Sequence, residues 1–107
     1  MRGMLRSILE GAGYQVVGEA ANGEEALEQY AELQPDLVLM DIVMPVMDGL
    51  EATERLRRSQ PRAKVVICSA MGQKETVLKA MQAGARDFII KPFTPERVLE
   101  AVRRGLR

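Results

Sequence analysis

The chain has 107 residues, of which 47% are hydrophobic and 28% are charged, as in an ordinary globular domain. Its 15 basic residues balance its 15 acidic residues, so charge gives no reason to expect a nucleic acid or an acidic membrane surface as a partner. A single cysteine excludes an internal disulfide framework and fits a reducing cytoplasm, and no apolar run is long enough to cross a bilayer.

Residues 1–12 carry hydrophobic side chains at helical spacing, which predicts a helix. The pattern is already running at residue 1, and no capping residue precedes it. We therefore expect a domain shortened at its amino-terminal end. The segment YQVVGEA (14–20) predicts a short strand. Asn22 and Glu25 form a capping pair that predicts a second helix, which ends before Pro35.

The rest of the chain alternates strands with helices. Three further strands are predicted at residues 36–41, 64–70 and 87–92. Helices are predicted to begin after Asp48 and after Thr94. Another helix is predicted between them, with Val77, Leu78 and Met81 as its buried residues. The first two of these strands are apolar on both faces, which is typical of buried parallel strands. The order predicts an α/β fold of four parallel strands, with five helices covering both faces.

Three polar residues fall at the carboxyl ends of predicted strands, where ligands bind in parallel sheets. They are Asp41, Ser69 and Lys91. Taken singly, each has an ordinary interpretation: a strand-end cap, a satisfied hydroxyl and a surface lysine. Taken together, a carboxylate, a hydroxyl and an ammonium at one edge suit a phosphoryl group, with the carboxylate as nucleophile.

The run DLVLMDIVMPVMDGLEA, with ICSA and FIIKPF at the expected intervals, resembles the receiver domain of two-component response regulators, and most of all the stand-alone chemotaxis type. The resemblance covers residues 1–107 as one domain and implies a flavodoxin-like, doubly wound parallel sheet. It implies that Asp41 accepts a phosphoryl group from a histidine kinase, that Ser69 and Lys91 contact that group, and that a downstream protein target reads the result. Such a domain is not an enzyme. Because the phosphorylated histidine belongs to the kinase, the absence of histidine from this chain is consistent with this role.

The resemblance also assigns supporting roles. Ser69 and the aromatic Phe88 fall at the switch positions of the family. The carboxylate of Asp41 and the backbone carbonyl of Val43 fall at Mg²⁺-binding positions. Pro92 matches a proline that usually follows a cis peptide bond.

The family pattern begins with a central strand that ends in two acidic residues, and this sequence has no counterpart of either. We therefore expect weak or absent Mg²⁺ binding, impaired phosphorylation, and a gap in the sheet. Rearrangement, strand exchange or association into a homodimer or higher oligomer would close that gap. The alternative function is a non-phosphorylated module for self-association or partner binding. A nucleotide or flavin binder is disfavoured because the sequence has no glycine-rich phosphate loop, and a hydrolase with an aspartyl-phosphate intermediate would also need the acidic pair.

Overall fold

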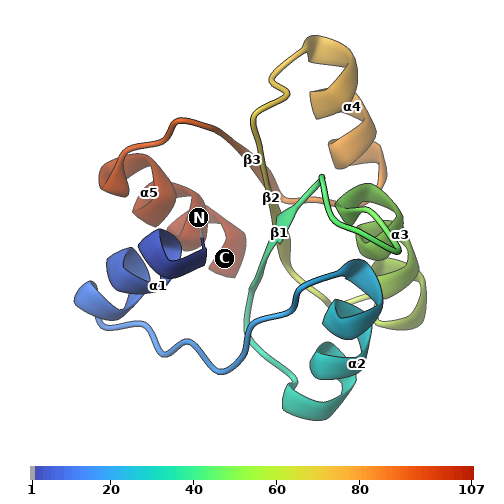
Figure 1. Ribbon diagram of the computed structural model, residues 1–107, viewed down its shortest axis with the longest axis horizontal. Coiled ribbons are helices and arrows are strands. Elements are labelled where there is room, and N and C mark those ends of the chain that lie inside the picture. Colours follow the sequence, from blue (N-terminus) through green and yellow to red (C-terminus); the bar gives the residue numbers. More distant parts are fainter. Residues whose placement is uncertain (1) are drawn as a thin grey trace.

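The computed structural model describes residues 2–107, in which helices and strands alternate (Figure 1). Residue 1, which the sequence assigns to the first helix, lies outside this range. The helices are α1 (Arg2–Gly11), α2 (Gly23–Leu33), α3 (Gly49–Ser59), α4 (Lys74–Gln82) and α5 (Pro95–Leu106), and the strands are β1 (Val38–Asp41), β2 (Val65–Ser69) and β3 (Asp87–Ile90). The strands form one parallel sheet in the order β1-β2-β3. The predicted parallel α/β fold with five helices is confirmed.

The helices cover both faces of the sheet, with α1 and α5 on one side and α2, α3 and α4 on the other (Figure 1). Successive residues of a strand point to opposite faces, so each strand supplies both layers. On the α1 and α5 side, Val66 and Ile89 pack with Leu5 and Val98. The other layer contains Met40, Val65 and Ile67 with Tyr30 and Leu56. All five residues of β2 are buried, which makes it the centre of the core.

Side-chain caps fix where three of the helices begin. Asn22, Asp48 and Thr94 each accept a hydrogen bond from the backbone N–H three residues further on, at 2.9, 2.8 and 3.2 Å. Each bond satisfies a donor that the first turn of a helix would otherwise leave free. All three caps were predicted from the sequence, and each helix starts at the next residue.

Residues 14–20 do not form the predicted strand, so the described residues contain three strands and not four. A strand needs a neighbouring backbone at about 4.8 Å. A groove of about 630 Å³ lies beside β1, and this segment lines it. The Glu19 carbonyl instead accepts a hydrogen bond from Gln29 Nε2 at 2.6 Å, and Val17 is 48% exposed. The segment has the composition of a strand, but its backbone has no ladder partner among residues 2–107.

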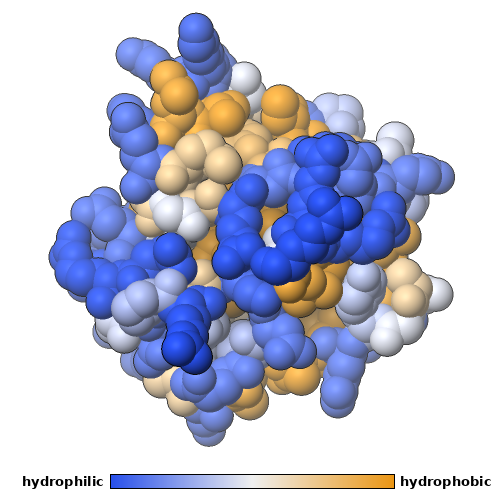
Figure 2. All heavy atoms as spheres, turned by 180° about the vertical axis from the view of Figure 1, so that it is seen from behind, coloured by the Kyte–Doolittle hydropathy of each residue, from blue (hydrophilic) through white to orange (hydrophobic). Residues whose placement is uncertain are grey.

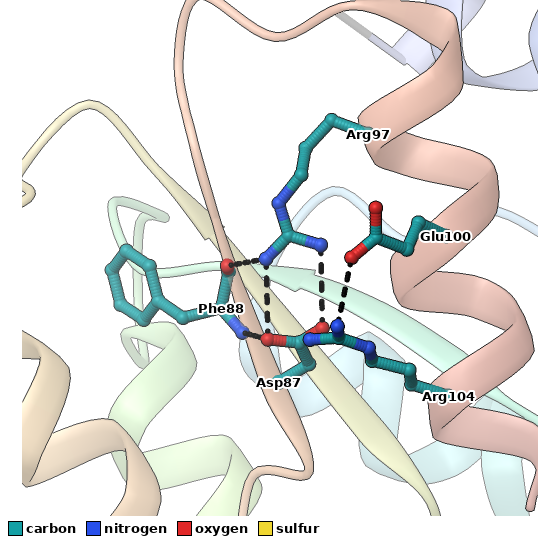
Figure 3. A network of polar contacts seen from close by, with 5 residues as sticks. All are labelled: Asp87, Phe88, Arg97, Glu100 and Arg104. Atoms are coloured by element: carbon teal, nitrogen blue, oxygen red, sulfur yellow. Dashed lines mark hydrogen bonds and ion pairs between the residues drawn. The ribbon is translucent and has the colours of Figure 1, made fainter.

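The outer edge of β3 is covered by side chains. Lys91 donates its backbone N–H to the Ser69 carbonyl at 2.9 Å. Because alternate residues of a parallel strand bond to the same neighbour, the backbone of Phe88 faces away from β2. Its N–H donates to Asp87 Oδ1 at 2.8 Å, and its carbonyl accepts from Arg97 Nη2 at 2.8 Å (Figure 3). Arg97 also pairs with the Asp87 carboxylate at 3.2 Å, so α5 closes this edge.

The outer edge of β1 has no such cover. Val38 donates its backbone N–H to the Lys64 carbonyl at 2.9 Å, which places Val38 and Met40 on the β2 side. The backbone groups of Leu39 and Asp41 therefore point into the groove. Within residues 2–107, β1 pairs with β2 alone. The sheet has one closed edge and one open edge.

None of the helices in the described range is long and apolar enough to cross a membrane.

Candidate functional site

Asp41 and Lys91 meet at the carboxyl edge of the sheet. Asp41 is the last residue of β1, and Lys91 directly follows β3, on the other side of the central strand. Lys91 Nζ lies 2.8 Å from Asp41 Oδ2, and the two side chains are 26% and 22% exposed. Partial burial reduces solvent screening, so this ion pair is stronger than one at the open surface. The Lys91–Pro92 peptide bond is cis.

Ser69 ends the strand that lies between those two residues. It is 1% exposed, and its Oγ accepts a hydrogen bond from the Met71 N–H at 3.0 Å. The hydroxyl proton remains available for donation. The three predicted side chains therefore come from three adjacent strand ends; Asp41 and Lys91 are in direct contact, while Ser69 is anchored to the following loop.

The loop after β1 is held tightly against the site. Val43 donates its N–H to Asp41 Oδ1 at 3.3 Å, and Gly49 donates its N–H to the Ile42 carbonyl at 2.8 Å. A Cβ at Gly49 would collide with the Asp41 carbonyl. Only glycine lets the start of α3 approach the backbone of the aspartate this closely, which explains the glycine of the MDG triplet.

A strained residue lies within the same loop. Val46 has a φ of 69°, in the left-handed region that a β-branched residue rarely adopts, and its side chain is 78% exposed. No packing of the side chain offsets this backbone strain. Strain of this kind concentrates at functional sites. No sequence pattern predicted this conformation, because valine is not a residue that favours left-handed turns.

Phe88 is 7% exposed and packs in the core layer that contains Met40 and Ile67. Its backbone N–H and carbonyl are hydrogen-bonded to the side chains of Asp87 and Arg97. Sequence reasoning missed this clamp. An acidic residue at a strand start and an arginine in the first turn of the next helix are its only signals, and neither follows a periodic pattern.

The donor atoms present do not fit a Mg²⁺ site. Mg²⁺ takes octahedral oxygen ligands, usually including one or two carboxylates, whereas the expected set here is one Asp41 oxygen and the Val43 carbonyl. Glu19, a conceivable substitute, pairs with Arg6 at 2.7 Å. In the described part of the chain, no group of three or more His, Cys, Asp or Glu residues could hold a metal ion.

Cys68 lies beside the site without taking part in it. It pairs with Asp41 in the β1–β2 ladder and is 1% exposed. Burial raises the pKa of its thiol from 9.0 to about 12, although the Lys91 charge acts in the opposite direction. The thiol is therefore fully protonated at neutral pH and is not a nucleophile there.

Comparison with known families adds an independent result. Residues 1–103 match the family described as the response regulator receiver domain. The chain is 54% identical over 104 residues to the chemotaxis protein CheY of Thermotoga maritima, a match that covers 97% of this chain and 87% of that protein. It is 51% identical over 106 residues to CheY of Bacillus subtilis, with 99% and 88% covered.

Solved structures give the same result for the fold. A CheX–CheY complex with BeF3 and Mg²⁺ from Borrelia burgdorferi has a similar chain, with a TM-score of 0.91 at 34% identity, covering 94% of this chain and 77% of that one. The response regulator domain of Thermotoga maritima CheB has a TM-score of 0.90 at 32% identity, with 99% and 87% covered.

Proposed function

This chain belongs to the family of response regulator receiver domains, and we propose that it accepts a phosphoryl group on Asp41 from the phosphohistidine of a histidine kinase. Receiver domains are signalling modules of two-component systems, not enzymes in the ordinary sense. The observation that carries the proposal is the contact between Asp41 and Lys91, 2.8 Å apart at the strand ends.

The chemistry follows from these groups. An Asp41 carboxylate oxygen bonds to phosphorus while the phosphorus–nitrogen bond of the donor breaks. The imidazole nitrogen keeps the electron pair of that bond and takes up a proton. The Lys91 ammonium, already beside the carboxylate, offsets the negative charge of the phosphoryl oxygens. The Ser69 hydroxyl on the middle strand donates a hydrogen bond to the same group.

We further propose that this reaction is slow in the 107-residue chain. Receiver domains of this family use Mg²⁺. The two oxygen donors available here are too few for a magnesium site, and Glu19 is already engaged by Arg6. Charge on the phosphoryl oxygens therefore depends on Lys91 and Ser69 alone, without the stabilisation that a divalent ion supplies.

A small phosphoryl donor tests the acceptor directly. The chain is incubated with acetyl phosphate, and phosphorylation is followed by intact mass. The site is mapped by tryptic digestion after borohydride has reduced the aspartyl phosphate to homoserine. We expect labelling of the wild type, no labelling of Asp41→Asn, and slower labelling of Lys91→Met. Asp36→Asn, at an exposed position two residues before β1, is the matched control and should label normally. Equal labelling of Asp41→Asn and wild type would refute the proposal.

We propose that a downstream protein docks on the α4–β3 side, because relatives of this type have such targets, CheX among them. Val77 of α4 packs on the core as predicted, but Leu78 and Met81 were expected to be buried and are 50% and 43% exposed. Ile90 at the end of β3 is also 50% exposed. Figure 2 shows hydrophobic atoms uncovered at the upper left, where α4 lies. Only one side of α4 contacts the sheet, so its other apolar residues remain free.

A second candidate is a non-phosphorylated module that associates with itself or with another protein. The unpaired edge of β1 favours this candidate. Light scattering separates the two: a monomer at high concentration excludes self-association. A partner whose affinity is the same for wild type and Asp41→Asn, in the presence of acetyl phosphate, would favour the module over the phosphoacceptor.

A further inference from the structure

Charge on the surface of this chain is segregated, although its totals balance. Three of the helices neutralise much of their charge internally, because α1, α3 and α5 contain ion pairs between residues four positions apart. Helix α2 differs from them, since it contains four glutamates and no basic residue. Unpaired charge therefore collects on particular surfaces, and two of these surfaces are opposite in sign.

The first surface, the acidic face of α2, is formed by Glu24, Glu28 and Glu32. These residues recur every four positions, so they form one row about 12 Å long. All three are exposed, whereas Tyr30 of the same helix packs in the core. Within residues 2–107, none of the three has an ion-pair partner. Like charges four positions apart repel one another, so a cationic surface along the row would relieve that repulsion.

The second surface, the basic end, lies at the amino edge of the sheet. Its cations are Arg57, Arg62, Lys64 and Arg103. Arg57 Nη1 donates to the Ala63 carbonyl at 3.0 Å, directly before Lys64. Lys64 Nζ in turn donates to the Leu106 carbonyl at 2.8 Å. Arg103 belongs to the last turn of α5, which ends at Leu106. The end of α3, the start of β2 and the end of α5 therefore bring these cations together.

The positive charge of the basic end is not neutralised by this chain. Arg57 and Lys64 donate to carbonyl oxygens, and none of the four cations has an ion-pair partner among the described residues. Part of the charge has a structural role, because cations favour helix carboxyl ends. Arg62 has no such role, since it is exposed between α3 and β2. Asp36, which precedes β1, is one exposed acid at this edge, and the cations outnumber it.

We propose that the basic end of one copy of this chain binds the acidic face of α2 on a second copy. The net charge of zero favours a like copy as the partner, because two copies do not repel each other at long range and each carries both halves of the contact. The contact does not use the unpaired edge of β1. The basic end also lies at the opposite edge of the sheet from Asp41, so this contact and the proposed phosphoryl transfer can fail independently.

Sedimentation velocity over a range of protein concentrations tests the contact. Association should be present in about 10 mM salt and absent in about 1 M salt, because the screening length falls from about 30 Å to about 3 Å. Glu28→Lys combined with Glu32→Lys should weaken association at least about tenfold. Arg62→Glu combined with Arg103→Glu should weaken it by a similar factor. All four side chains are exposed, and circular dichroism verifies that each variant is folded.

The controls separate this contact from an effect of net charge. Lys74→Glu combined with Lys79→Glu changes the net charge as the arginine variant does, at exposed positions of α4, and should retain most of the association. The chain with all four reversals has a net charge of zero again and should associate as the wild type does, because the signs of both surfaces are exchanged.

Three results would overturn the proposal. The first is a monomer at every concentration in about 10 mM salt, and the second is a chain with all four reversals that does not recover association. The third is association that persists in about 1 M salt, because apolar or backbone contacts would then be sufficient.

Discussion

The two edges of the sheet differ in whether their outward backbone groups have hydrogen-bond partners. At the β3 edge, Asp87 and Arg97 satisfy both backbone groups of Phe88, and α5 lies alongside (Figure 3). At the β1 edge, the backbone of Leu39 points into a groove of about 630 Å³. Unpaired edges invite pairing with other chains, and proteins commonly block them with charged side chains. One edge is covered by side chains of this chain, and the other has no ladder partner within residues 2–107.

The proposed phosphoacceptor pair joins these two unequal edges. Asp41 is the last residue of the open edge strand, and Lys91 directly follows the closed one, with β2 between them. The position of the carboxylate therefore depends on a strand that is laddered on one side only. Support of β1 should influence both stability and reactivity, whereas changes at the β3 edge should influence stability alone.

The largest effect should come from filling the open edge in cis. A strand of about five aliphatic and β-branched residues, fused ahead of the chain by a short linker, would bury at least three side chains between α1 and α2. At about 1.5–3 kcal/mol for each, the gain in the free energy of unfolding should be on the order of 5 kcal/mol. Urea denaturation measures it. An unchanged midpoint would show that the groove does not accept a strand.

The last two residues of that fused strand sharpen the experiment. If they are aspartates, they add carboxylates near Asp41, and Mg²⁺-dependent phosphorylation by acetyl phosphate should appear. A twin ending in two asparagines should be equally stable but unresponsive to Mg²⁺. If the aspartate version is stable and still takes no phosphoryl group, the phosphoacceptor function fails and the interaction module becomes the better account.

Uncovering the closed edge should have a smaller effect. Arg97→Met removes the donor to the Phe88 carbonyl and the partner of Asp87, so the free energy of unfolding should fall by about 1–2 kcal/mol. Arg104→Met is the control, because Arg104 pairs with Glu100 in a surface contact where both side chains are about half exposed (Figure 3); it should cost about 0.5 kcal/mol or less. Equal losses for the two variants would show that Arg97 does not clamp the edge. Light scattering should also show new association for Arg97→Met.

Local signals in the sequence were sufficient for much of this architecture. The caps at Asn22, Asp48 and Thr94 involve residues three positions apart, so the sequence contains all the information they need. The placement of Asp41 and Lys91 at one edge follows from parallel strands alternating with helices, and their contact is present in the structure. These predictions succeeded because they need only local chemistry and the topology.

Most of the failures depend on distant neighbours. Residues 14–20 have strand composition, but whether they form a strand depends on a backbone at ladder distance, which no local pattern reports. The Arg97–Asp87 clamp depends on how α5 approaches β3, and the exposure of Leu78 depends on how much of α4 contacts the sheet. The positive φ of Val46 accompanies a tight local turn in its loop, in which the Met47 N–H donates to the Pro45 carbonyl at 2.7 Å, against the preference of valine itself.

That loop ends the open strand, and relieving its strain should stabilise the chain modestly. Val46→Gly removes about 1–2 kcal/mol of left-handed strain and costs about 0.5–1 kcal/mol in chain entropy. A net gain of about 0.5–1 kcal/mol is expected in urea denaturation. Val43→Gly is the matched control: it is 72% exposed and has an ordinary φ, so it should only lose stability. A loss of stability in Val46→Gly would contradict the strain argument.

The smallest effect concerns Cys68, whose reactivity toward a thiol reagent measures opening of the β1 edge without any substitution in the fold. Its thiol lies on β2 opposite Asp41 and lines the groove, so reagent reaches it when β1 moves away. Burial raises its pKa to about 12. The folded state thus keeps a proton that the unfolded state releases above pH 9.0, and the free energy of unfolding should fall as pH rises from 9.0 toward 12. At pH 8 this contribution is fully present.

Labelling of the thiol at pH 8 should therefore be slow in the native chain and should measure opening of β1. A strand fused into the groove should slow it at least tenfold, since β1 would then be laddered on both sides. Arg97→Met should accelerate it only as far as global stability falls, because β3 does not cover the thiol from the groove side. If Arg97→Met instead accelerated labelling of Cys68 much more than its loss of free energy of unfolding explains, the two edges would open together. The claim that the β1 edge opens independently of the β3 edge would then be wrong.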